Sequence, residues 1–133
     1  MMNNLITDLQ SIKNELIIIQ DYLEITPSEE ITEIEDRGNQ LIVYIARTSK
    51  LLADAKYHKN EKLNSTFVND IKKISGLSAS LANKFVDSLC KDENHLIDWC
   101  ERLNRASTHG YEWTRSLLSK ATAEWKYNHF TSR

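Results

Sequence analysis

Apolar residues recur along most of this chain at intervals of three and four positions, the repeat expected of α-helices that bury one side. In the first stretch the repeating positions are Leu5, Leu9, Ile12, Leu16, Ile19 and Leu23. A sustained alternation of fours and threes is a heptad pattern, which is typical of helices packed against other helices. The pattern predicts a first helix over about residues 3–24.

A second, longer helix is predicted over residues 27–64. The single proline of the chain stands in Thr26-Pro27-Ser28-Glu29, where Thr26 can cap a helix and Glu29 can complete a capping box. The apolar repeat then runs through Ile31, Ile34, Gly38, Leu41, Ile45, Thr48, Leu52 and Ala55. A glycine inside a helix is less favourable than alanine by roughly 1 kcal/mol, so we expect a neighbouring side chain to rest against Gly38.

Two more helices are predicted over residues 66–75 and 78–128. Gly76 separates them and suits the left-handed turn that often follows a helix. The repeat of the last helix runs through Leu81, Phe85, Leu89, Asp92, Leu96, Trp99, Leu103, Ala106, Gly110, Trp113, Leu117 and Lys120. It places Gly110 and Trp113 in the helical interior. A continuous helix through Gly110 is the favoured interpretation, and a fresh start capped by Thr108 is the alternative.

Together these elements predict an all-α fold. We expect an antiparallel helical bundle, or coiled-coil-like hairpin, of two long helices with two shorter helices. Three Gly and one Pro in 133 residues leave few tight turns, and the length suits a single domain over residues 1–133. Because the first helix is too short to cover both long helices, an apolar strip remains, which favours a homodimer.

Hydropathy and cysteine usage predict a cytoplasmic protein without membrane association. The longest apolar runs, residues 16–19 and 41–46, are far shorter than the ~20 residues of a membrane span, and no secretory signal is visible. Cys90 and Cys100 are expected on one helix, about 15 Å apart, and therefore as free thiols. Their spacing does not suit a zinc site, and we expect no metal and no cofactor.

Charge is distributed unevenly along the chain. The net charge of −2 combines −8 over residues 1–36, +2 over residues 37–101 and +4 over residues 102–133. The acidic residues at the start of the second predicted helix are Glu29, Glu30, Glu33, Glu35 and Asp36. The helix dipole favours acids only in the first turn. These side chains therefore form either a solvated face or a docking patch for a protein with a basic surface.

The last predicted helix carries a basic counterpart. Its basic residues are Arg102, Arg105, Arg115 and Lys120. With the nearby Trp125 and Tyr127, these side chains can bind single-stranded DNA or RNA by contacting phosphates and stacking on bases. The isoelectric point near 6.1 counts against this interpretation, because dedicated nucleic-acid-binding domains usually have a clear excess of basic residues.

Few residues suggest chemistry. Asp54 and His58 share a helix face, which is more typical of a surface pair than of a metal site, and His109 is expected to be a buried, hydrogen-bonded histidine. The segment Glu29-Glu30-Ile31-Thr32-Glu33 is similar to the EExxE half of the magnesium site in MazG-type nucleotide pyrophosphohydrolases. No ExxD follows on a later helix, so a MazG-like enzyme is a disfavoured alternative and we predict no catalytic residue.

Two stretches carry a resemblance to known proteins: ARTSKLLADAKYHKNEKL at residues 46–63 and LNRASTHGYEWTRSLLSKA at residues 103–121. They are similar to a loose set of small helical proteins encoded by phages and prophages of the Bacteroidetes. The resemblance includes no catalytic motif. It implies a protein that acts by binding, as an accessory factor in nucleic-acid metabolism or as an inhibitor of host defence, including CRISPR effectors.

The sequence therefore predicts a non-enzymatic protein that binds a host or phage protein with a basic surface. An inhibitor of a nucleic-acid-handling or defence complex is the most concrete form of this hypothesis, with the acidic residues 29–36 facing a basic nucleic-acid channel. An accessory protein that binds single-stranded DNA or RNA is the alternative.

Overall fold

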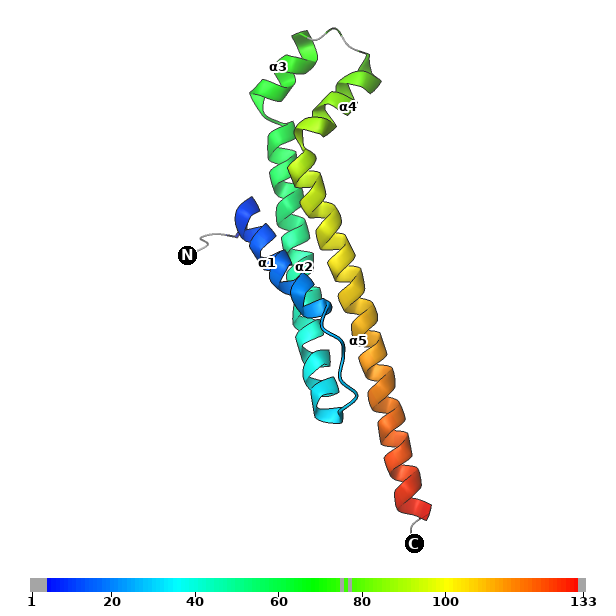
Figure 1. Ribbon diagram of the computed structural model, residues 1–133. Coiled ribbons are helices and arrows are strands. Elements are labelled where there is room, and N and C mark those ends of the chain that lie inside the picture. Colours follow the sequence, from blue (N-terminus) through cyan, green and yellow to red (C-terminus); the bar gives the residue numbers. More distant parts are fainter. Residues whose placement is uncertain (1–4, 75, 77, 132–133) are drawn as a thin grey trace.

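The computed structural model describes residues 5–74, 76 and 78–131, and within these ranges the chain is all-helical, as predicted. The helices are α1 (Leu9–Leu23), α2 (Ile31–Leu63), α3 (Thr66–Ile74), α4 (Ala79–Leu89) and α5 (Lys91–Thr131). Two parts of the predicted helices, residues 3–4 and residue 75, lie outside the described residues. The predicted hairpin of two long helices is confirmed, because α2 and α5 pack against each other along most of their lengths (Figure 1).

Two glycines let α2 and α5 approach closely. A Cβ atom on Gly38 of α2 would lie only 2.9 Å from Cγ2 of Thr114, and one on Gly110 of α5 would lie 3.1 Å from Cδ1 of Leu41. The neighbouring side chain expected against Gly38 is therefore Thr114. The helix continues through Gly110, which confirms the favoured interpretation.

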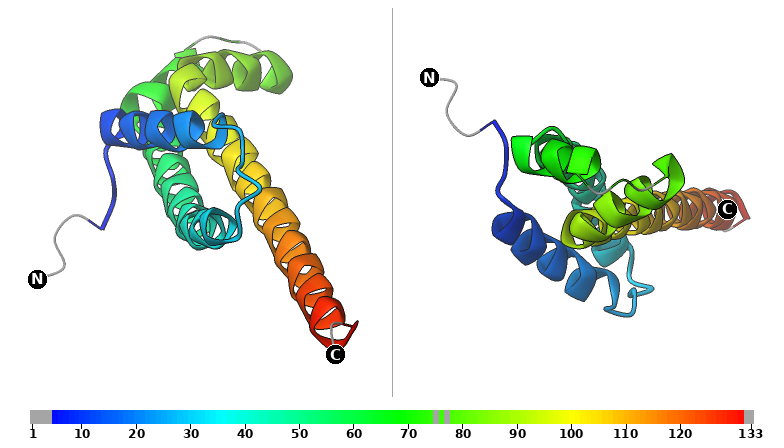
Figure 2. Two further views of the ribbon diagram at one scale, coloured as in Figure 1. Left: turned by 60° about the horizontal axis from the view of Figure 1, so that its bottom comes forward. Right: turned by 90° about the horizontal axis from the view of Figure 1, so that it is seen from above.

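Helix α1 covers one face of the α2–α5 pair (Figure 2). It begins after Asp8, whose carboxylate accepts a hydrogen bond of 2.8 Å from the amide of Ser11, so the helix starts later than predicted. The core that α1 forms with the pair contains Ile12, Leu16, Ile19, Leu51, Ala55, Leu96, Cys100 and Leu103. The apolar repeat of the first stretch thus predicted the buried side of α1.

The second long helix begins later than predicted. Helix α2 begins at Ile31 rather than at Pro27, and its preceding residue Glu30 makes no capping hydrogen bond through its side chain. The hydroxyl of Ser28 instead accepts a hydrogen bond of 3.1 Å from the amide of Glu30. Residues 24–30 must run from the end of α1 along the pair to the start of α2 (Figure 1), so they cannot begin a helix at Thr26.

The predicted helix over residues 78–128 is two helices. Helix α4 ends at Leu89 and is followed by Cys90, which is completely buried and has φ −97° and ψ 22°. The carbonyl of Cys90 accepts a 2.8 Å hydrogen bond from the amide of Asn94 at the start of α5, so the chain changes direction within about one residue. Cys90 and Cys100 therefore do not share a helix. Gly76 has a φ of +62°, as expected for the turn between α3 and α4.

The buried side of α5 also differs from the prediction. Trp113 is 62% exposed and Ala106 is exposed, whereas Ser107 and Thr114 are buried. Likewise Asp92 is exposed and Glu93 is buried, pairing with Lys62 at 3.3 Å. The reason is the close approach of the helices: where Leu41 rests on Gly110, there is room for small side chains but not for an indole ring.

Candidate protein-binding surface

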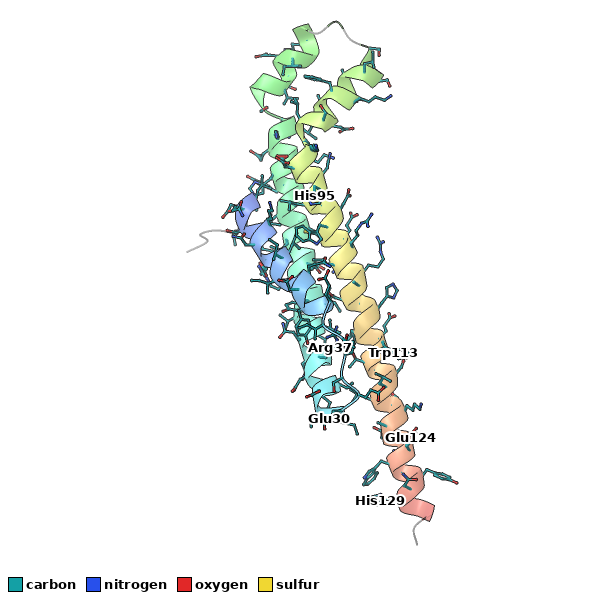
Figure 3. The ribbon with its side chains drawn as sticks, in the orientation of Figure 1. Glu30, Arg37, His95, Trp113, Glu124 and His129 are labelled. Atoms are coloured by element: carbon teal, nitrogen blue, oxygen red, sulfur yellow. The ribbon has the colours of Figure 1, made fainter. Side chains whose placement is uncertain are left out.

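The five acidic residues at the start of α2 form an exposed surface, called here the acidic patch. It consists of Glu29, Glu30, Glu33, Glu35 and Asp36, all of which are exposed. Glu30 accepts a hydrogen bond from the hydroxyl of Thr32, and within the described residues no member of the patch forms an ion pair. Figure 3 shows Glu30 at the start of α2, the end of that helix that points away from α3 and α4.

The basic residue that follows the acidic patch, Arg37, contacts α1 and does not pair with the patch. The guanidinium carbon of Arg37 lies 5.0 Å from the centre of the Tyr22 ring, a distance at which the cation is attracted to the ring face. Tyr22 in turn packs edge-on against Tyr44 of α2, with ring centres 5.2 Å apart. Arg37 therefore stabilises the contact between α1 and α2, and the acidic patch keeps its negative charge exposed to solvent.

Exposed apolar side chains accompany the acidic residues of the N-terminal third. Ile17 and Ile18 project from the outer side of α1, and Ile25 is exposed on the segment that leads to the acidic patch. Asp21 and Glu24 stand between them and are also exposed. A surface that combines uncovered apolar groups with exposed carboxylates has the composition of a protein-binding surface.

The basic residues predicted to contact nucleic acid do not form a continuous basic track. All four are exposed on α5, at Arg102, Arg105, Arg115 and Lys120. Arg102 and Lys120 stand 18 residues apart, about 27 Å along a helix. The exposed acids Asp98 and Glu112 share this outer side of α5, and they offset much of its positive charge.

Asp54 and His58 bind the main chain of the N-terminal segment. The Asp54 carboxylate accepts a 3.0 Å hydrogen bond from the amide of Thr7, and His58 Nε2 lies 2.7 Å from the carbonyl oxygen of the same residue, to which it donates. Lys50 donates to Asp54 and to the carbonyl of Leu5. These three side chains therefore hold residues 5–7 against α2. The sequence identified the Asp54–His58 spacing but not its partner.

The Asp54 contact predicts a pH-dependent contribution to stability. Burial by itself raises the pKa of Asp54, but the hydrogen bonds from Lys50 and Thr7 outweigh it and lower the pKa below its usual 3.8. A lowered folded-state pKa stabilises the protein above pH 3.8, and this stabilisation is lost as the pH falls through the folded-state value. At pH 7 we expect Asp54→Asn to reduce the free energy of unfolding by about 1.5 kcal/mol.

Urea unfolding of the wild type and Asp54→Asn, followed by circular dichroism at several pH values, checks this expectation. The difference between the two proteins should shrink as the pH falls below 3.8, because the protonated carboxyl of the wild type no longer carries the charge. Asn14→Asp, which introduces a carboxylate at an exposed position of α1, is the control for general charge effects. A difference that stays constant down to acid unfolding would contradict the assigned role.

The remaining candidates for chemistry are structural or exposed. Burial raises the pKa of Cys100 to about 12 and also raises that of Cys90, so both thiols stay protonated and are poor nucleophiles. His109 was expected to be buried but is exposed, 3.8 Å from Glu112, because it lies on the outer side of α5. Among the described residues no group of three or more His, Cys, Asp or Glu side chains is arranged to hold a metal ion.

A surface cavity lies on α5. It has a volume of about 430 Å³ and is lined by His95, Asp98, Trp99 and Arg102. The Trp99 indole donates a 3.1 Å hydrogen bond to the side-chain oxygen of Gln20, and the His95 ring lies 5.7 Å from that of Trp99. Trp99 therefore serves the contact between α1 and α5, and it is partly buried against the core, as its place in the apolar repeat predicted.

Within the described residues no helix combines the length and the apolar character that crossing a membrane requires. Comparisons of the chain with protein-family models, with curated proteins and with solved structures find no match.

Proposed function

We propose that this protein is a non-enzymatic helical interaction protein that binds a protein partner with a basic surface. The observation that carries the proposal is the acidic patch: five exposed carboxylates without an ion pair in the described residues, located just before and on the first two turns of a long helix. Charged groups that are free before binding attract an oppositely charged surface and orient it on approach.

The neighbouring apolar side chains can supply binding affinity. Charge complementarity mainly sets the rate and specificity of association, whereas buried apolar contacts supply most of the affinity. Ile18 and Ile25 are exposed near acidic residues, so the N-terminal third offers both kinds of contact. The partner surface is expected to be basic with apolar residues among its cations.

The most concrete form of the proposal is an inhibitor of a nucleic-acid-handling complex of the host, such as a defence complex of the CRISPR type. The channel of such a complex is lined by cations that bind phosphates. A row of carboxylates on a rigid helix presents negative charge to the same cations. The protein would then compete with nucleic acid for the channel.

A charge-reversal variant tests the proposal. Partners are captured from a bacterial host lysate by the wild type and by Glu30→Lys/Glu33→Lys/Asp36→Lys, identified by mass spectrometry, purified and titrated at low salt. We expect the triple variant to bind the captured protein at least about tenfold more weakly, because three attractive contacts become repulsive. Added salt should weaken the wild-type complex.

The matched control is Asp92→Lys/Asp98→Lys/Glu112→Lys, which makes the same change in net charge at exposed positions of α5. It should bind the partner like the wild type. Equal binding by the wild type and the patch variant would contradict the proposal. Capture of single-stranded nucleic acid without a protein would do so as well and would favour the alternative, in which the affinity should fall log-linearly with salt concentration.

A further inference from the structure

The face of the α2–α5 pair opposite α1 carries a regular pattern of its own, called here the back face. On α2, residues seven positions apart share this side: Glu35, Ile42, Ser49 and Lys56. On α5 the corresponding heptad series is Ile97, Asn104, Tyr111, Leu118 and Trp125, flanked by Glu101, Thr108, Arg115 and Thr122. A spacing of seven residues keeps side chains in one line along a helix.

Contacts within the protein place these two series on the same side. The amide of Asn104 donates hydrogen bonds to the carbonyl of Ile45 and to the hydroxyl of Ser49, both at 3.1 Å. Near the start of α2, one groove of about 260 Å³ is lined by both helices. Its residues are Ile31, Glu35, Leu118, Ala121, Thr122 and Trp125.

The back face carries uncovered apolar side chains among its polar ones. Ile42 is 47% exposed and Trp125 is 59% exposed, while Tyr111 and Leu118 are half-buried. In both views of Figure 2, α1 lies along a single side of the pair. Helices with a second apolar line beside their packed one are typical of bundles with more than two long helices.

The charges that border the back face are complementary between the two helices. The α2 series begins with an acidic residue, Glu35, and ends with a basic one, Lys56. The flanking α5 series likewise begins with the acidic Glu101 and continues to the basic Arg115. Because α2 and α5 are antiparallel, Arg115 lies near the level of Glu35, as the neighbouring contact of Thr114 with Gly38 indicates. The two side chains form no ion pair within the described residues. They border the back face on opposite helices.

We infer that the back face binds a second copy of this chain, with a two-fold axis parallel to the long helices. This symmetry packs α2 of one copy against α5 of the other. Because the axis is parallel to the helices, each residue of α2 faces the same part of α5 in the second copy as it does within its own copy. Ile42 then meets the second copy's Tyr111, Ile31 meets its Leu118, and Glu35 meets its Arg115. The result is a bundle of four long helices in which all touching helices are antiparallel.

The inference deepens the proposed function, because the axis brings the acidic patches of both copies to the same end of the dimer. A partner would then meet two acidic patches, and binding at one would raise the effective concentration at the other. Dimer formation itself requires no partner. Its test is therefore independent of the test of the proposed function.

Sedimentation equilibrium of the full chain at low salt, over a range of protein concentrations, tests the inference. We expect a wild-type dimer, and dissociation constants at least about tenfold higher for Glu35→Arg and for Arg115→Glu alone. The double variant Glu35→Arg/Arg115→Glu should recover the wild-type value to within about threefold, because the swapped charges attract again. Circular dichroism verifies that each variant is folded.

Two controls separate this arrangement from others. Glu33→Arg changes the net charge by the same amount as Glu35→Arg but lies outside the back face. It should leave the dimer intact. Ile42→Lys should give a monomer, whereas Ile18→Lys on the outer side of α1 should not. A wild type that is monomeric at every concentration, or a double variant that dissociates as readily as the single variants, would overturn the inference.

Discussion

Leu16→Ala should lower the free energy of unfolding by about 2–5 kcal/mol, the largest single effect we expect. Leu16 is completely buried and sits at the centre of the side of α1 that packs on the α2–α5 pair, between Ile12 and Ile19. Removing its three outer carbons loses apolar burial and leaves a cavity lined by residues of three helices. Since α1 is only 15 residues long, it has few other contacts to replace this one.

The matched control is Ile18→Ala, in the same helix but 61% exposed. It should change the stability by no more than about 0.5 kcal/mol. Urea unfolding followed by circular dichroism and by tryptophan fluorescence measures both, because Trp99 reports on the contact of α1 with α5. If the two variants were equally stable, α1 would not be packed as the structure has it.

The sequence predicted the helices and the buried sides of α1 and α2 because these depend on local spacing. The repeat of Leu9, Ile12, Leu16 and Ile19 is strong, and the packing that it predicts against neighbouring helices is present. The bend at Cys90 was missed because a turn of about one residue leaves the intervals of three and four nearly unchanged. Helix boundaries depend on tertiary contacts that spacing does not record.

The interior of α5 was mispredicted for a different reason. Hydrophobicity favoured Trp113, but the structure buries Thr114 and Ser107. The Thr114 hydroxyl donates a 2.8 Å hydrogen bond to the carbonyl of Gly110 in its own helix, as the Thr48 hydroxyl does to Tyr44 at 2.7 Å. Such threonines serve as small core residues, because their polar atoms are satisfied locally. Size and not polarity decides which residues fit between closely spaced helices.

The sequence was sufficient to identify the residues of the acidic patch, but not the tertiary contacts that neighbouring charged residues make. Local sequence identified all five members of the acidic patch, and their exposure follows from their charge. The position of Arg37 over Tyr22 and the pairing of Glu15 with Arg47 at 2.6 Å depend on where α1 lies. These contacts decide which charges remain free, and they join residues that are distant in the sequence.

Gly38→Leu should lower the free energy of unfolding by about 3 kcal/mol, because it forces the two long helices apart. Even a Cβ atom at Gly38 would lie 2.9 Å from Cγ2 of Thr114, closer than packed carbon atoms come. A leucine adds three further carbons to this contact, and overpacking of this kind outweighs the roughly 1 kcal/mol that a better helix former gains over glycine. Thermal and urea unfolding measure the loss.

An alanine at position 38 tests whether the methyl group of Thr114 causes the destabilisation. Gly38→Ala should be destabilising in the wild type, since the methyl group of Thr114 must move, yet stabilising when combined with Thr114→Ser, which removes that methyl and keeps the hydroxyl that bonds Gly110. Gly110→Ala, which meets the more movable end of Leu41 at 3.1 Å, should be tolerated better than Gly38→Ala. If Gly38→Ala had the same effect with threonine and with serine at position 114, the close approach of α2 and α5 at this level would be wrong, and with it the register from which the dimer is inferred.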